Sequence, residues 1–155
     1  MTVNRRTFLR AGMAAATTAL AAGAGLLSPG RVLAAWPEQA FMARSLDDAL
    51  AAMNLGGARA SSEVTVEAPD IAENGAVVSV TVTTRLPEVE SITVLVPKNT
   101  MPLISSYGFG PRTEGFITGR IKMRETSDVI GVVKAGGRLY MAKKPVKVTL
   151  GGCGG

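Results

Sequence analysis

The sequence contains no histidine and only one cysteine among its 155 residues. A Ser-His-Asp triad needs a histidine, a zinc site of cysteine and histidine ligands needs several such residues, and an intramolecular disulfide needs two cysteines. None of these three arrangements can form within this chain. Most enzyme mechanisms are thereby excluded. We expect a non-catalytic protein with no metal and no other cofactor.

The first 34 residues are typical of a twin-arginine export signal. The paired arginines of "NRRTFLR" are followed by an uncharged stretch, Ala11–Leu27, and by Val32-Leu33-Ala34, which fits a signal-peptidase site. The alternative is a membrane anchor, but the stretch is short and weakly apolar compared with the roughly 20 apolar residues of a spanning helix. We expect cleavage after Ala34, folded export to the periplasm and no membrane attachment afterwards.

The positive charge of the chain comes mainly from this signal. The formal net charge is +5, from 17 basic and 12 acidic residues. Residues 1–34 hold four arginines and no acidic residue, which leaves 17 minus 4 basic residues against 12 acidic ones, a net charge near +1. This balance gives no support for nucleic-acid binding. The rest is long enough for one domain, residues 35–150, followed by a tail at 151–155.

A helix is expected at the start of the domain, from Glu38 to Met53. Ser45 fits an N-cap with Asp48 three residues later, and Gly56-Gly57 ends the pattern. The apolar residues that share one face of this helix are Leu46, Ala49, Leu50 and Met53.

After these glycines the period changes to two, which is typical of half-buried strands. Apolar and polar residues alternate in 78–83, 91–96 and 146–150. The turn residues between strands are Glu73-Asn74-Gly75, Leu86-Pro87-Glu88, Pro97-Lys98-Asn99 and Gly136-Gly137. The last pair predicts a two-residue hairpin loop between Val129–Lys134 and Arg138–Lys143. About seven such strands predict an all-β, immunoglobulin-like antiparallel β-sandwich with a short N-terminal helix.

Two of these strands depart from simple alternation. Val129–Val133 is apolar on both faces, so its second face must be covered either by the N-terminal helix of the same chain or by a partner subunit. In the other strand, cations share one face opposite Ile117, Ile121 and Met123. This stripe is either a solvated sheet face or a surface that attracts a small anion or an acidic protein. Its polar members are Thr118, Arg120, Lys122 and Arg124, with Arg112 as a possible neighbour.

The only cysteine, Cys153, lies in the terminal "GGCGG". Glycine has the largest backbone freedom, so Gly151, Gly152, Gly154 and Gly155 predict a flexible arm that does not pack on the domain. Fully extended, five residues span roughly 16 to 18 Å. The thiol of such an arm can therefore enter a deep pocket of another protein while the sandwich stays outside.

The local sequence supplies no base or cation that would activate this thiol. We interpret Cys153 as a point of covalent attachment whose cargo is processed by other proteins. The alternatives are a structural or interaction sandwich with an incidental tail, and a thiol redox enzyme, which lacks a resolving cysteine here. An unused thiol in an oxidising compartment would invite dimerisation and overoxidation, which favours a function for it.

Taken together, the export signal, "APDIAENGAVVSVTV", "VKAGGRLYMAKKPVKVTL" and the terminal "GGCGG" resemble the SoxY family of sulfur-carrier subunits. The resemblance implies that Cys153 carries sulfur in the periplasmic Sox system, which oxidises thiosulfate. It also implies a stable SoxZ partner, a second sandwich subunit. The enzymes that act on the cargo would be a c-type haem protein that couples thiosulfate to the thiol, a hydrolase that releases sulfate, and a sulfane dehydrogenase.

Overall fold

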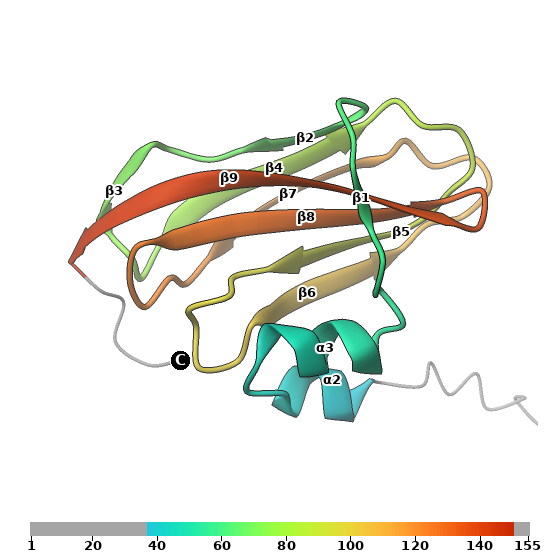
Figure 1. The fold of residues 1–155 in the computed structure, drawn as a ribbon. Helices are drawn as coiled ribbons and strands as arrows, with labels where there is room; N and C mark the ends of the chain where they lie inside the picture. The colour runs from blue at the N-terminus through green and yellow to red at the C-terminus, as the bar shows by residue number, and fades with distance from the viewer. Residues whose placement is uncertain (1–36, 151–155) are drawn as a thin grey trace, which may run out of the picture. The chain divides into compact units, whose positions relative to one another are not determined.

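The computed structural model describes residues 37–150, which fold into two β-sheets packed face to face and two short helices (Figure 1). The predicted immunoglobulin-like β-sandwich with N-terminal helical structure is therefore confirmed. The predicted signal at residues 1–34 and the predicted arm at residues 151–155 lie outside the described residues. Within residues 37–150, no helix is long and apolar enough to span a membrane.

Within residues 37–150, nine strands form the two sheets. The larger sheet has the order β1-β9-β8-β5-β6, with β3 also paired to β9, and the smaller has the order β2-β4-β7. The strands are β1 (Arg59–Ala60), β2 (Val64–Glu67), β3 (Ile71–Asn74), β4 (Val78–Thr84), β5 (Val89–Leu95), β6 (Leu103–Gly108), β7 (Phe116–Ile121), β8 (Ser127–Ala135) and β9 (Arg138–Leu150).

The antiparallel prediction fails at two short strands. Both β1 and β3 pair parallel with β9, whereas all the other strand pairs are antiparallel. These two strands have two and four residues and mostly exposed side chains, so they carry little of the alternation by which strands are found in a sequence.

The core between the sheets follows the predicted alternation. In β4, Val78, Val80 and Val82 are buried, while the Ser and Thr residues between them face outward. The inward side chains of both sheets form one apolar cluster. Burial of each such side chain contributes about 1.5–3 kcal/mol relative to exposure.

The predicted single helix is wrong in extent, because the chain forms two helices, α2 (Glu38–Met42) and α3 (Leu46–Ala52). Ser45 is the N-cap of α3, and its Oγ accepts a hydrogen bond from the Asp48 N–H at 3.1 Å, as predicted. An N-cap residue has extended backbone, and Ala43 is extended as well. The same signal that begins α3 therefore excludes one continuous helix.

The helices cover the second face of β8. Ile130 and Val132 are 7% and 1% exposed and pack in a second apolar cluster with Ala40 of α2 and Ala49 of α3. The opposite face of β8 packs against the smaller sheet through Val129 and Val133. Of the two alternatives for this strand, cover by helices of the same chain is correct, and both faces of residues 129–133 are buried within the chain.

The β8–β9 hairpin forms as predicted at Gly136-Gly137, where φ is +53° and +70°. However, β9 is a single strand of 13 residues, whereas the sequence predicted two separate strands. Pro145 does not interrupt it. The Lys147 N–H donates to the Asp70 carbonyl on the β3 side of the strand. In a strand, residues two apart direct their backbone nitrogens to the same side, so the nitrogen of Pro145, which has no hydrogen to donate, faces the gap between β1 and β3.

The two sheets approach each other closely at Gly131 in β8. A Cβ at this position would lie 2.9 Å from Val66 Cγ2 and 3.0 Å from Val82 Cγ1. We predict that Gly131→Ala lowers the free energy of unfolding by about 1–3 kcal/mol, because the sheets must separate to admit the methyl group. The measurement is urea unfolding.

Gly119 of β7 is the matched control, because a Cβ there would meet no atom within 4 Å. Gly119→Ala should change the free energy of unfolding by less than about 0.5 kcal/mol. Equal losses in the two variants would contradict close packing at Gly131.

A carboxylate stabilises the hairpin end of the sandwich. Glu90 lies 2.7 Å from Lys134 Nζ and accepts the Gly137 N–H at 2.7 Å. The hydrogen bond from Lys134 and then that from Gly137 lower the pKa of Glu90 below its ordinary value of 4.5. Because the folded-state pKa is depressed, this stabilisation is present above the unfolded-state pKa and is lost as pH falls through the folded-state pKa.

We predict that Glu90→Gln lowers the urea midpoint at pH 7 and that the difference from the parent shrinks as the pH is lowered past the ordinary Glu pKa of 4.5. The effect is small, because both side chains are more than 40% exposed. A difference that stays constant from neutral to acid pH would show that the charge of Glu90 is not what stabilises the turn.

Candidate functional site

The candidate site is the end of β9, where the chain continues into the predicted arm. The residues predicted to carry and move the cargo lie outside the described residues: Cys153, Gly151, Gly152, Gly154 and Gly155. What the structure describes is the surface from which this segment starts. Figure 1 shows β9 running from the β8–β9 hairpin at one end of the sandwich to β3 at the other.

The last residues of β9 are held by hydrogen bonds on both sides of the strand. On one side, the Val148 N–H donates to Thr126 Oγ1 at 3.0 Å. On the other side, Thr149 Oγ1 donates to the Glu73 carbonyl at 2.9 Å, and the Leu150 carbonyl accepts the Gly75 N–H at 2.8 Å. The strand is therefore fixed up to its last described residue.

The turn after β3 joins this strand end to the other sheet. Asn74 Oδ1 accepts the Ala76 N–H at 2.8 Å, which confirms the predicted turn at residues 73–75. Gly75 donates to Leu150, and its carbonyl accepts the Met123 N–H at 2.7 Å. These two hydrogen bonds of Gly75 thus place the residues that follow β7 beside Leu150, the last described residue of β9.

The predicted cationic stripe is exposed, and half of it lies at this end. Lys122 and Arg124 flank the buried Met123 after the end of β7. Asn99, 9% exposed, holds this segment: its Nδ2 donates to the Lys122 carbonyl at 2.7 Å and its Oδ1 accepts the Arg124 N–H at 2.9 Å. Arg112, by contrast, lies in the loop that precedes β7, so it does not extend the stripe at this end.

Beside β9 lies a hollow of about 450 Å³ that the sequence did not predict. It is lined by Asp70, Lys98, Thr126, Ser127, Asp128, Pro145, Val146 and Lys147. Its residues come from four separate segments, so no local pattern marks it. We call it the β9 hollow.

The two carboxylates of the β9 hollow already have cationic partners. Asp70 is hydrogen-bonded to Lys144, which lowers the pKa of Asp70 below its ordinary value. Asp128 lies 3.8 Å from Lys143. Lys98 and Lys147 are both exposed, and neither forms an ion pair with any residue of 37–150. The hollow therefore carries two uncompensated positive charges.

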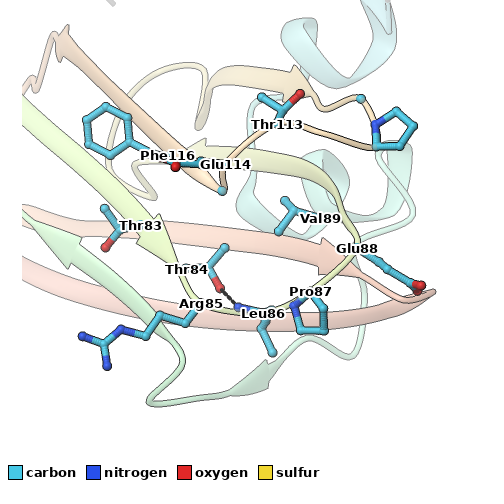
Figure 2. A pocket seen from close by; sticks show the side chains of 13 residues that line it. Thr83, Thr84, Arg85, Leu86, Pro87, Glu88, Val89, Thr113, Glu114 and Phe116 are labelled. Carbon is cyan, nitrogen blue, oxygen red and sulfur yellow. Dashed lines mark hydrogen bonds between the residues drawn. The ribbon is translucent and has the colours of Figure 1, made fainter.

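A second hollow, of about 490 Å³, lies between the β4–β5 turn and the loop before β7 (Figure 2). Glu88, on its wall, accepts the N–H of Gly136 in the hairpin through its carbonyl, so this hollow lies at the end of the sandwich away from Leu150. Its ionisable side chains, Arg85, Glu88 and Glu114, are open to solvent. Across residues 37–150, no three Cys, Asp or Glu side chains are grouped so as to hold a metal ion.

The fold is that of a β-sandwich protein, and in the sequence its last described strand is followed by the single cysteine. The family model described as "Sulfur oxidation protein SoxY" matches residues 52–153, a span that reaches Cys153. The chain belongs to this SoxY family.

Among solved structures, the chain is similar to the sulfur carrier protein SoxY from Chlorobium limicola f thiosulfatophilum. The two are 40% identical, with a TM-score of 0.61, over 68% of this chain and 97% of that one. A superoxide reductase (neelaredoxin) from Ignicoccus hospitalis shares the fold alone, at 18% identity and a TM-score of 0.50 over 67% of this chain and 92% of that one. No curated protein matches the sequence.

Thr126 should determine how firmly the end of β9 is held. Thr126→Val removes the acceptor of the Val148 N–H and the donor to the Val148 carbonyl. We predict a loss of about 1 kcal/mol of unfolding free energy. Amide exchange at Val148 should become faster while exchange in β5 changes little, which NMR measures residue by residue.

Thr118→Val is the matched control. Among residues 37–150 its hydroxyl bonds only to the Thr81 hydroxyl, at 3.1 Å, on the outer face of the smaller sheet, so its loss leaves no backbone group of this range unpaired. Exchange at Val148 should stay at the parent rate in this variant. If Thr126→Val also left it unchanged, the hydroxyl would not hold the strand end.

Proposed function

We propose that the chain carries sulfur covalently on Cys153 and presents it to the enzymes of thiosulfate oxidation. The observation that supports this most directly is the match to the SoxY family across residues 52–153, which includes the only cysteine. The similar Chlorobium limicola protein is described as a sulfur carrier. The firmly held end of β9 fits this function, because it gives the carrier segment a fixed starting point.

The chemistry begins with the thiol. The Cys153 thiol and thiosulfate lose one proton and two electrons as a sulfur–sulfur bond forms, which gives a cysteine S-thiosulfonate. A c-type haem partner takes the two electrons. Water then cleaves the bond to the terminal sulfonate at a partner hydrolase, and sulfate and a proton leave while a persulfide stays on Cys153. A sulfane dehydrogenase oxidises the remaining sulfur.

In these steps the chain is the substrate of the partner enzymes and catalyses none of them itself. Its described residues offer no metal-binding cluster, and the sequence supplies no base or resolving cysteine for the thiol. A non-catalytic carrier needs neither. What it needs is reach, and five residues beyond Leu150 span roughly 16 to 18 Å when extended.

The partners and the compartment belong to the same proposal. We expect a stable complex with a SoxZ subunit and transient contacts with the three enzymes. Export through the twin-arginine route would bring the folded chain to the periplasm, with residues 1–34 removed. Neither nucleic acid nor a membrane is an expected partner of the mature chain.

Cys153→Ser tests the carrier function. We predict that the variant keeps the thermal midpoint of the parent, because the two apolar clusters are formed by residues of 37–150 and the substitution changes one small side chain outside that range, and that it supports no thiosulfate oxidation. Intact mass of the parent, purified from the periplasm without reductant, should show added sulfur or sulfonate on Cys153 that a thiol reductant removes.

The competing function, a structural sandwich with an incidental tail, predicts the opposite results. Deletion of residues 151–155 would then leave the function unchanged, and the parent would carry a bare thiol in cells that are fed thiosulfate. Undiminished thiosulfate oxidation by the Cys153→Ser variant would overturn the carrier proposal.

A further inference from the structure

We propose that the β9 hollow is a binding site for the sulfonate group of the loaded arm, held by Lys98 and Lys147. This inference rests on the proposed carrier function and adds a resting position for the cargo. The ligand is a sulfur oxyanion attached to Cys153 of the same chain.

The charge of the site fits this ligand. Lys98 and Lys147 line the hollow, and within the described part of the chain neither has a carboxylate in ion-pair range. The carboxylates of the hollow are those of Asp70 and Asp128, and Lys144 and Lys143 respectively accompany them. A thiosulfonate on Cys153 carries one negative charge.

The hollow also has a surface for the sulfur atoms. Exposed Pro145 lines the hollow together with the two lysines. Sulfane sulfur is soft and weakly hydrated, whereas sulfonate needs cations or hydrogen-bond donors. The wall therefore offers an apolar contact and a charged one side by side.

The length of the arm matches the distance. Lys147 lies three residues before Leu150 in an extended strand, which places the two Cα atoms about 10 Å apart. Residues 151–153 span at most about 10 Å when extended, and a reversal after Leu150 uses part of this length. Such a reversal brings Cys153 back part of the way toward Lys147, and the long side chains of Lys147 and of the loaded cysteine cover the remaining distance. Glycine at positions 151 and 152 permits such a reversal.

Weak affinity is sufficient for this site. A group on a short linker is present at an effective concentration of the order of millimolar. A site with millimolar affinity for a sulfonate is then occupied for about half of the time. It holds the cargo at rest, yet it releases the arm to an enzyme that binds it more tightly.

The test uses the full chain loaded chemically. Tetrathionate reacts with the Cys153 thiolate to give the S-thiosulfonate and free thiosulfate. Methyl methanethiosulfonate gives a neutral methyl disulfide on the same sulfur and releases methanesulfinate. We expect the charged cargo, but not the neutral one, to shift the amide NMR signals of Lys98, Ser127 and Lys147.

Substitutions distinguish binding by the two lysines of the β9 hollow from a general attraction to the cations at this end of the sandwich. The double variant Lys98→Gln/Lys147→Gln should lose at least about half of these shifts, and added salt should reduce them in the parent. Lys122→Gln is the matched control, because Lys122 is an exposed cation of the same end that does not line the hollow. It should keep the shifts of the parent.

Shifts confined to residues next to Leu150, or equal shifts in the double variant and the parent, would overturn the site. The site would also be overturned if the double variant kept the shifts of the parent but was loaded more slowly by a partner enzyme. The two lysines would then bind an acidic partner protein rather than the cargo. Loading by tetrathionate needs no other protein. A failure of the carrier function would instead appear as Cys153 without cargo in cells, whatever the NMR result.

Discussion

Burial of β8 on both of its faces is the constraint on which the rest of the structure depends. Val129 and Val133 fill the space between the sheets, and Ile130 and Val132 fill the space beneath α2 and α3. A strand that is apolar on both sides is stable in water only when two layers cover it. The close approach of the sheets at Gly131 and the packing of the two helices both follow from this requirement.

This central strand also determines where the functional end of the chain lies. β8 pairs with β9 over nine residue pairs, and the tight turn at Gly136-Gly137 fixes their register. Because β9 extends beyond β8, its final residues need other partners, and Thr126, Glu73 and Gly75 supply them. β9 is therefore held in place along its whole length, up to Leu150, from which the predicted arm begins.

The two ends of the sandwich differ in how their charged side chains are paired. At the hairpin end, Glu90 and Lys134 neutralise each other and secure the turn. At the arm end, Lys98 and Lys147 have no carboxylate partner among residues 37–150. If the segment after Leu150 carries an anionic group, as we propose, this unpaired positive charge has a direct physical use, since opposite charges attract across a few ångströms.

Local patterns in the sequence determined much of this protein. Alternation in residues 78–83 gave β4, Ser45 gave the start of α3, and the lone Cys153 between glycines, with no histidine in the chain, indicated a carrier rather than an enzyme. Only the tertiary structure decided that α2 and α3, and not a partner, cover β8, that Pro145 lies inside one long strand, and that Lys98 and Lys147 share a hollow. The reason is that periodicity and capping act between neighbours along the chain, whereas these arrangements arise from contacts between segments that lie far apart in the sequence.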